Sequence, residues 1–105
     1  MKRIYIAGPI SGLPQQNRPA FDKAKGLVRL SGFFPVSPLD LVGPDEPEHE
    51  YVYYIKQGLD LLDSCECALF LDGWRKSYGA RIERLFARRE GKELYEFRKG
   101  VMRRV

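Results

Sequence analysis

Glu83 is the residue whose position in the sequence most strongly suggests chemistry. It lies in the segment 74–90, WRKSYGARIERLFARRE, which contains five arginines and one lysine. At about 100° per residue of a helix, Glu83 falls on an arc of small and apolar residues, opposite an arginine-rich arc. Its neighbours three and four positions away, where a helix would place a pairing cation, are uncharged. These neighbours are Gly79, Ala80, Phe86 and Ala87, and the arginines opposite are Arg81, Arg84 and Arg88.

A carboxylate on the apolar arc is partly desolvated, and this costs free energy unless a specific group or ligand receives the charge. Gly79 and Ala80, one turn earlier, leave room for a ligand at the N-terminal end of the helix, where backbone N–H groups favour anions. A second interpretation stays open, in which Glu83 lies at the edge of the stripe and reaches water or a neighbouring backbone group. The spacing alone does not decide between a reactive carboxylate and a boundary residue.

Short apolar runs alternate with segments of helical spacing, which predicts a mostly parallel α/β sheet with helices on both faces. The expected strands are RIYIAG at 3–8, FFPVSP at 33–38, CALFLDGW at 67–74 and KELYEF at 92–97. One helix is expected from Pro19 to just before Gly32, with Asn17 or Arg18 as its cap. The others are expected from Val52 to about Ser64 and after a cap at Ser77.

The loops that follow the first and third expected strands are the candidate site. In a parallel α/β sheet, ligands collect at the carboxyl ends of the strands, where GPISGLP at 8–14 and DGWRKSYG at 72–79 would come together. The segment LDLVGPDEPEHE at 39–50 is polar and broken by proline, so we expect a connection there.

The charge of the chain suits an anionic partner without identifying one. The 105 residues are enough for one compact domain, and 18 Lys and Arg against 14 Asp and Glu give a net charge of +4. A solvated basic face with no dedicated ligand is the simpler interpretation of the C-terminal excess. A stripe of arginines could contact DNA phosphates, but no recognised DNA-binding motif accompanies it, so nucleic acid is not the favoured partner. The stripe consists of Arg81, Arg84, Arg88 and Arg89.

Cys65 and Cys67 would point to opposite faces of a strand, so we expect no disulfide between them. C-x-C lacks the C-x-x-C spacing of redox and zinc motifs, and His49 is the single histidine, so we expect neither a metal nor a cofactor. A reduced, cytoplasmic location is the simplest inference. Nothing at the N-terminus resembles a signal peptide, and no apolar run approaches the length of a membrane span.

Three segments, IYIAGPISGLP, the following N-x-P-A-F and LFLDGWRKSYGARIE, resemble the nucleoside 2-deoxyribosyltransferase-like superfamily. The last is similar to the GW-x-x-S-x-GA-x-x-E signature of its small phage and prophage branch of unknown function. The resemblance covers residue 4 to about residue 97, so we expect one domain over 1–97 and a basic tail over 98–105. It implies a flavodoxin-like (Rossmann-like) sheet of four to five strands, in oligomeric proteins that cleave or exchange the bond between a nucleobase and deoxyribose.

The resemblance implies a catalytic role for two residues. The family's nucleophile is the glutamate of GA-x-x-E, which falls on Glu83. It attacks the anomeric carbon and forms a glycosyl ester, which water or a second base then resolves. The first-strand tyrosine that holds this glutamate in the family falls on Tyr5, which would otherwise be taken as an ordinary core aromatic.

The resemblance also implies a sugar and phosphate site in the two loops, for a nucleoside or nucleotide. Ser11 and Ser77 occupy the places of the family's phosphate-binding serines, although Ser77 can also be a simple helix cap. Trp74 could stack on a nucleobase or plug the edge of the sheet. The loop residues expected to face the ligand with backbone N–H groups or small side chains are Gly8, Pro9, Gly12 and Gly79.

Gly58 is a departure from the family pattern. The family's second helix usually carries an aspartate seven or eight residues before the strand that leads to the GW loop, and aligning on Cys65 and Trp74 puts Gly58 there. Asp60 lies about 200° further round a helix, so it is a poor substitute. The glycine is expected to open space near the pocket, and Asp72, at the carboxyl end of the third strand, could compensate for the missing acid.

Two classes of function stay open. The first is an N-glycosidase or deoxyribosyltransferase with Glu83 as nucleophile and Tyr5 orienting it. The second is a catalytically inactive nucleotide-binding module of the same fold, which Gly58 would permit. An unpaired carboxylate would repel an anionic ligand, which favours the enzyme. A homo-oligomer is expected, and Tyr51, Tyr53 and Tyr54 could supply a subunit contact.

Overall fold

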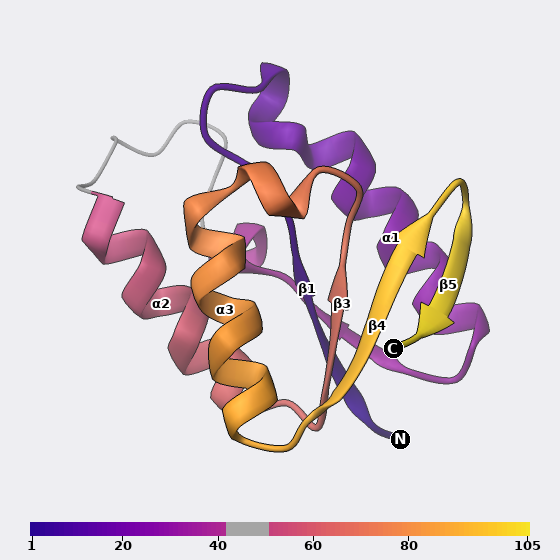
Figure 1. Ribbon diagram of the computed structural model, residues 1–105. Helices are drawn as coiled ribbons and strands as arrows, with labels where there is room; N and C mark the ends of the chain where they lie inside the picture. The colour runs from indigo at the N-terminus through magenta and orange to yellow at the C-terminus, as the bar shows by residue number, and fades with distance from the viewer. Residues whose placement is uncertain (42–50) are drawn as a thin grey trace.

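The structure, a computed structural model, describes residues 1–41 and 51–105 and forms one sheet between two layers of helix (Figure 1). The strands are β1 Arg3–Ala7, β2 Phe34–Val36, β3 Cys67–Phe70, β4 Glu93–Arg98 and β5 Val101–Arg104. The α-helices are α1 Arg18–Leu30, α2 Tyr51–Asp63 and α3 Tyr78–Arg89, and the short 3-10 turns are η1 Pro14–Asn17, η2 Pro38–Asp40 and η3 Trp74–Lys76. Most of the expected connection at 39–50, including His49, lies outside the described residues.

The sheet has the order β2-β1-β3-β4-β5, with the first four strands parallel and β5 antiparallel to β4. Helices α2 and α3 cover one face, and α1 covers the other (Figure 1). This arrangement confirms the predicted α/β class, because each of the four expected strands and three expected helices is present.

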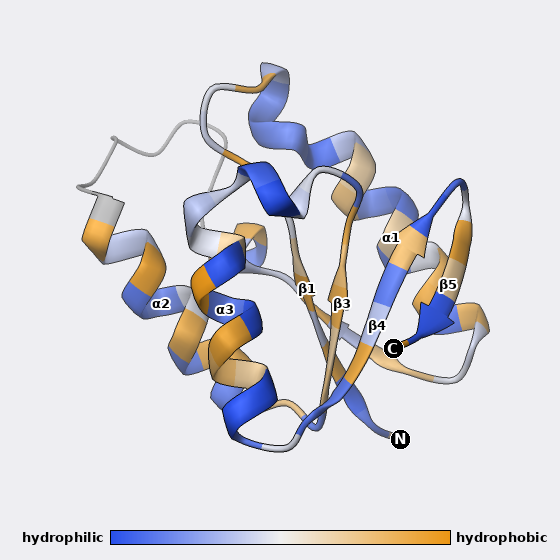
Figure 2. Cartoon of the chain, viewed as in Figure 1, coloured by the Kyte–Doolittle hydropathy of each residue, from blue (hydrophilic) through white to orange (hydrophobic). Residues whose placement is uncertain are grey.

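The central strands are buried on both faces, as parallel strands between helical layers must be. In β1, Ile4 and Ile6 belong to the core under α1, whereas Tyr5 and Ala7 belong to the core under α2 and α3. Figure 2 shows hydrophobic colours over most of β1 and β3, in the centre of the molecule.

The cysteines follow the same division between the two cores. Cys65 contributes to the core under α2 and α3, Cys67 to the core under α1, and both are free thiols. The expectation that they do not bridge each other is confirmed. Among the described residues, no helix is both long enough and apolar enough to cross a bilayer.

The segment expected to be a basic tail is largely part of the sheet. Residues 101–104 form β5, which pairs with β4 through Phe97 opposite Met102 and Arg98 opposite Val101. The two residues between the strands, Lys99 (φ 48°) and Gly100 (φ 79°), are both left-handed, as a tight hairpin turn requires. The hairpin corrects the sequence expectation, which did not recognise Lys-Gly as a turn because lysine rarely adopts positive φ.

Candidate active site

The buried hydrogen bond between Tyr5 and Glu83 is the centre of the candidate site. Tyr5 Oη, on β1, donates to Glu83 Oε2, on α3, across 2.5 Å. Tyr5 is fully buried, and Glu83 is only 8% exposed. The strand points Tyr5 towards α3 because alternate residues face alternate layers, and the helical period turns Glu83 inward with Ala80 and Ala87. Glu83 is therefore buried against the sheet and does not lie at a solvated edge.

Burial changes the acidity of both groups. It raises the pKa of Glu83 from the ordinary 4.5 to about 7, although the hydrogen bond from Tyr5 acts in the opposite direction. Burial, followed by the nearby charge of Glu83, raises the pKa of Tyr5 well above its ordinary value, so the tyrosine keeps its proton. None of the ion pairs formed by the described residues involves Glu83. The carboxyl group therefore has a proton donor beside it and no cation, and it titrates near neutral pH.

The backbone of Gly58, on α2, lies against both members of the Tyr5–Glu83 pair. A Cβ atom at this position would overlap Glu83 Oε2 and would lie 2.8 Å from Tyr5 Oη. The space that the glycine was expected to open near the pocket is occupied by the carboxyl group of Glu83. The α2 backbone approaches the pair more closely than any side chain would permit.

The two carboxyl oxygens of Glu83 differ in their surroundings. Oε2 accepts the hydrogen bond from Tyr5 and lies against Gly58. No hydrogen bond between described residues involves Oε1. Oε2 is therefore the oxygen that the described protein groups hold in place.

The two predicted loops do come together at the carboxyl edge of the sheet. The Leu71 N–H donates to Ala7 O at 2.8 Å. A Cβ atom at Gly8 would be 3.0 Å from Leu71 Cβ, so the backbone after β1 packs directly on the residue after β3. Gly73, with φ 85°, lies beside Pro9, and a Cβ there would be 3.5 Å from Pro9 Cγ. The glycines thus allow the loops to touch, which confirms their predicted proximity.

Asn17 holds the first loop, a role that the sequence did not reveal. The residue precedes α1 with a left-handed backbone (φ 59°) and makes no capping hydrogen bond with its side chain. Instead, Asn17 Nδ2 donates to Pro9 O at 2.9 Å. Asn17 thus occupies the expected N-cap position of α1, while its side chain braces the Gly8-Pro9 turn. The N-x-P-A-F segment was the available signal, but its partner lies eight residues earlier in the chain.

The two serines differ in what the structure shows of them. Ser77 precedes α3, and its hydroxyl accepts a 3.2 Å hydrogen bond from the Ala80 N–H, so its cap role is confirmed. Ser11 is exposed, next to an exposed Gly12 with φ 78°. Gly79 is half-buried in the first turn of α3. None of the hydrogen bonds of the described residues joins Ser11 or Ser77 to Glu83.

The ring of Trp74 is held by one aromatic ring and two guanidinium groups of the protein. Its ring contacts Phe70 edge to face at 5.7 Å between centroids. The guanidinium carbons of Arg84 and Arg75 lie 4.4 and 4.7 Å from its ring centroid. Cation–π contacts of this kind hold the ring in place. These contacts favour the plug interpretation of Trp74, because the indole already has protein partners.

Glu96, on β4, is a buried carboxylate that the sequence did not single out. It is 4% exposed, and its oxygens lie 2.8 Å from Arg84 Nη1 and 2.8 Å from Arg98 Nη2. Burial alone would raise the pKa of Glu96, but the Arg98 hydrogen bond and the Arg84 charge outweigh it, and the net result is a lowered pKa. The helical angle of Arg84 predicted that it belongs to a solvated stripe of arginines. The ion pair with Glu96 shows that it does not. The available signal was the strand period, which puts position 96 on the same face as Leu94.

Asp72 is exposed at the carboxyl end of β3 and lines a small hollow of about 40 Å³ that Glu96 and Arg98 also line. No hydrogen bond or ion pair of the described residues joins Asp72 to Tyr5 or Glu83. Within the described ranges, no three His, Cys, Asp or Glu side chains gather as metal ligands would.

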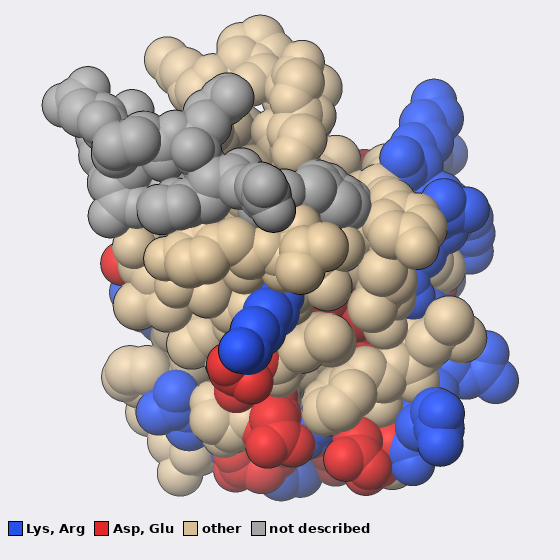
Figure 3. Space-filling view, turned by 90° about the vertical axis from the view of Figure 1, so that its left-hand side faces the viewer, with Lys and Arg blue, Asp and Glu red and all other residues tan. Residues whose placement is uncertain are grey.

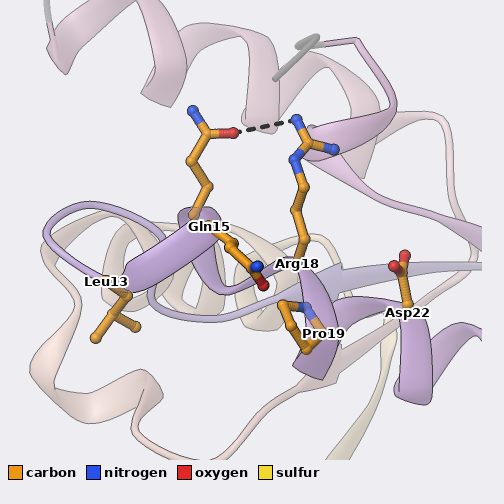
Figure 4. Close-up of a pocket in the computed structure, with 6 residues that line it drawn as sticks. Leu13, Gln15, Arg18, Pro19 and Asp22 are labelled. Atoms are coloured by element: carbon orange, nitrogen blue, oxygen red, sulfur yellow. Dashed lines mark hydrogen bonds between the residues drawn. The ribbon is translucent and has the colours of Figure 1, made fainter. Parts of the chain in front are cut away.

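A hollow of about 510 Å³ lies at the start of α1, and Leu13 is the one residue of the two candidate loops that lines it (Figure 4). Its lining comes from one stretch of chain, in which Arg18 Nη2 donates to Gln16 Oε1 at 3.1 Å. A hollow formed within a single loop is open surface and not a cleft between layers, so size does not identify the site. Its lining residues are Leu13, Gln15, Gln16, Arg18, Pro19 and Asp22.

The outer surface of α2 carries residues of the segment at which the sequence predicts a subunit contact. Figure 3 shows this side of the molecule as mostly uncharged, with acidic side chains gathered towards its lower edge. Val52 and Tyr53 are exposed there, and Tyr53 contacts Tyr54 edge to face at 5.5 Å. The side chain of Tyr51 lies outside what the structure describes, so a contact through the three tyrosines stays a prediction.

The fold is similar to that of a solved structure described as "2-desoxiribosyltransferase from Leishmania mexicana". The TM-score is 0.70 at 22% sequence identity, and the match covers 92% of this chain and 64% of that one. This likeness shows the flavodoxin-like fold alone, and the chain spans less than two thirds of the solved chain's length. A comparison with curated proteins gives no match. Residues 2–96 match the family model described as "Domain of unknown function (DUF4406)", and the chain therefore belongs to that family.

Proposed function

We propose that the protein cleaves or exchanges the bond between a nucleobase and deoxyribose, in a deoxynucleoside or its 5′-monophosphate, with Glu83 as nucleophile. The observation that carries the proposal is the buried 2.5 Å hydrogen bond from Tyr5 to Glu83. A carboxyl group held by one donor, with no cation beside it, is costly for a fold and useful for nucleophilic attack. The similarity in fold to a 2-desoxyribosyltransferase supports the substrate class.

The proposed reaction proceeds in two displacements. Glu83 Oε1 attacks the anomeric carbon, and the bond from that carbon to the base nitrogen breaks, with its electron pair leaving on the base. The base takes up a proton from solvent, and the sugar is left as an ester of Glu83. Water or the N–H nitrogen of a second base then attacks the same carbon, loses its proton to solvent and releases the carboxylate. Tyr5 keeps Oε2 oriented throughout, so that Oε1 stays aimed at the sugar.

The two joined loops would bind the rest of the substrate. We assign the sugar and phosphate to the loop of Gly8, Pro9, Ser11 and Gly12 and to the α3 N-terminus at Gly79, whose backbone N–H groups suit an anion. Ser77 would contribute through this helix start, because its hydroxyl already serves as the cap. Asp72 and Trp74 would border the base. An assembly through α2 would fit the exposed Val52 and Tyr53.

The experiment that tests the function is incubation with deoxynucleosides and their 5′-monophosphates, one panel with water alone and one with a second free base. Chromatography should detect released or exchanged base with wild type and none with Glu83→Gln. Glu90→Gln, at an exposed position at the end of the same helix, is the matched control and should keep full activity. Since the nucleophile must be ionised, the rate should rise with pH through about 7.

Two outcomes would change the conclusion. Base release that survives Glu83→Gln would exclude Glu83 as the nucleophile. Tight nucleotide binding by wild type without any release would favour the binding module instead. The contribution of Asp72 is read separately from Asp72→Asn, which should slow release without changing the pH at which the rate rises.

A further inference from the structure

Gly58, on α2, lies directly beside the Tyr5–Glu83 pair. It lies in the interior of a 13-residue helix and is buried. Glycine weakens a helix interior relative to alanine, so its presence there needs a reason. The reason is steric, because a Cβ atom would overlap Glu83 Oε2 and would crowd Tyr5 Oη at 2.8 Å.

A side chain at position 58 would collide with atoms that have few places to go. Tyr5 is fully buried in the sheet, and the backbone of α3 fixes the base of Glu83. The flexible part of the contact is the Glu83 carboxyl group, which would have to rotate or withdraw. Either movement takes Oε2 away from the tyrosine hydroxyl and changes the direction in which Oε1 points.

We infer that Gly58 is a positioning residue for Glu83, whose bare backbone forms the wall that directs Oε2 to Tyr5 and Oε1 towards the substrate. In this arrangement the glycine is a component of the site and does not replace a missing acid. An aspartate at position 58 would meet the same atoms as an alanine and would add a negative charge beside the Glu83 carboxylate. The inference rests on the proposed function for its catalytic meaning, but its geometry can be tested without any activity.

The chain provides a matched control in Gly26, the interior glycine of α1. It is exposed, and a Cβ atom there would meet nothing within 4 Å. Gly26→Ala and Gly58→Ala therefore make the same chemical change in two helices, with and without a neighbour. The first should leave the candidate site unchanged and slightly stabilise the protein, because it only improves helix propensity.

The direct test is NMR on the full chain, with the Glu83 side-chain carbon assigned by its loss in Glu83→Gln. Wild type and Gly26→Ala should titrate with a pKa of about 7. Gly58→Ala should titrate nearer the ordinary 4.5, because the displaced carboxyl group gains solvent, and the Tyr5 hydroxyl proton should lose its hydrogen-bonded signal. An unchanged pKa together with an unchanged hydroxyl signal would overturn the inference.

A second pair of variants keeps the test decisive if Gly58→Ala folds poorly. Glu83→Asp shortens the acid by one methylene and withdraws the carboxyl group from α2, which makes room for the added methyl group. The two changes should therefore be non-additive, with Gly58→Ala lowering the unfolding midpoint much less in the Glu83→Asp background than in wild type. Equal losses in both backgrounds would show that Gly58 does not act through Glu83.

Enzyme activity is the last measurement, and it separates a failure of the proposed function from a failure of the positioning role of Gly58. If wild type releases base, Gly58→Ala should lower kcat on the order of 100-fold with little change in KM, since ground-state binding is kept and the aim of the nucleophile is lost. A raised KM with unchanged kcat would contradict the positioning role. If wild type releases no base, the proposed function fails, while the NMR and double-variant results still decide the role of Gly58.

Discussion

Replacing Glu83 with glutamine should make the protein more stable at alkaline pH and leave its stability almost unchanged in acid. Glutamine has the same shape as a protonated glutamate, and its side-chain oxygen can still accept the hydrogen bond from Tyr5. The substitution removes only the ability to ionise. The comparison with wild type therefore measures how much the ionisation of the buried Glu83 carboxyl group destabilises the folded state.

The magnitude follows from the two pKa values of Glu83. Its pKa is about 7 in the folded chain and 4.5 ordinarily, which amounts to about 3 kcal/mol at roughly 1.4 kcal/mol per pH unit. Because the folded pKa is the higher one, the folded state binds the proton more tightly. In wild type, the stabilisation of the folded state by proton binding at Glu83 is fully present below about pH 4.5 and is lost as pH rises through about 7.

The assay is urea-induced unfolding followed by the fluorescence of Trp74, at a series of pH values from 4.5 to 8.5. The free energies of unfolding of wild type and Glu83→Gln should agree at the acid end, and the variant should exceed wild type by about 3 kcal/mol above pH 7.5. Glu90→Gln, at an exposed position, should show no such divergence. A constant difference between Glu83→Gln and wild type at all pH values would refute the reasoning, because no buried ionisation would then exist.

Three further changes test other parts of the structure. Tyr5→Phe should raise the pKa of Glu83 further, because the lost hydrogen bond is what lowers it, and carbon NMR would show the midpoint moving above about 7. Glu96→Ala should cost about 3–5 kcal/mol in urea unfolding, since it leaves the guanidinium of Arg84 largely buried without its carboxylate. Gly100→Val should destabilise the β4–β5 hairpin by about 1–2 kcal/mol, because a β-branched residue is strained at φ 79°, and hydrogen exchange in β5 should accelerate while α2 exchanges unchanged.

The arrangement of elements was largely predictable, because each was marked by its own residues. The apolar runs over β1 and β3 and the helical spacing before and after them predicted the parallel sheet, and Ser77 marked the start of α3. The β5 strand was missed, because Lys99 gives no turn signal until its backbone is seen to be left-handed. The role of Asn17 was also missed, since the same residue type serves as a helix cap or as a loop brace.

The candidate site was predictable only in part. The helical angle placed Glu83 on the apolar arc without deciding whether it is buried, and the alternation of strands and helices predicted that the two loops come together. The same angular reasoning put Arg84 on a solvated stripe, whereas Arg84 pairs with Glu96. The sequence predicted that Gly58 opens space near the pocket, but it did not reveal that the carboxyl group of Glu83 occupies that space.

By itself, the sequence determined which side of each helix and strand each residue occupies, because the periods of 3.6 and 2 are properties of a single element. Only the tertiary structure decided which of those sides meet and how closely. Tyr5 and Glu83 are 78 positions apart, and their hydrogen bond exists because α3 lies over β1 at a particular distance and rotation. The same packing brings the α2 backbone to Gly58 against their oxygens. That distance depends on the summed volumes of both layers, which no single element encodes.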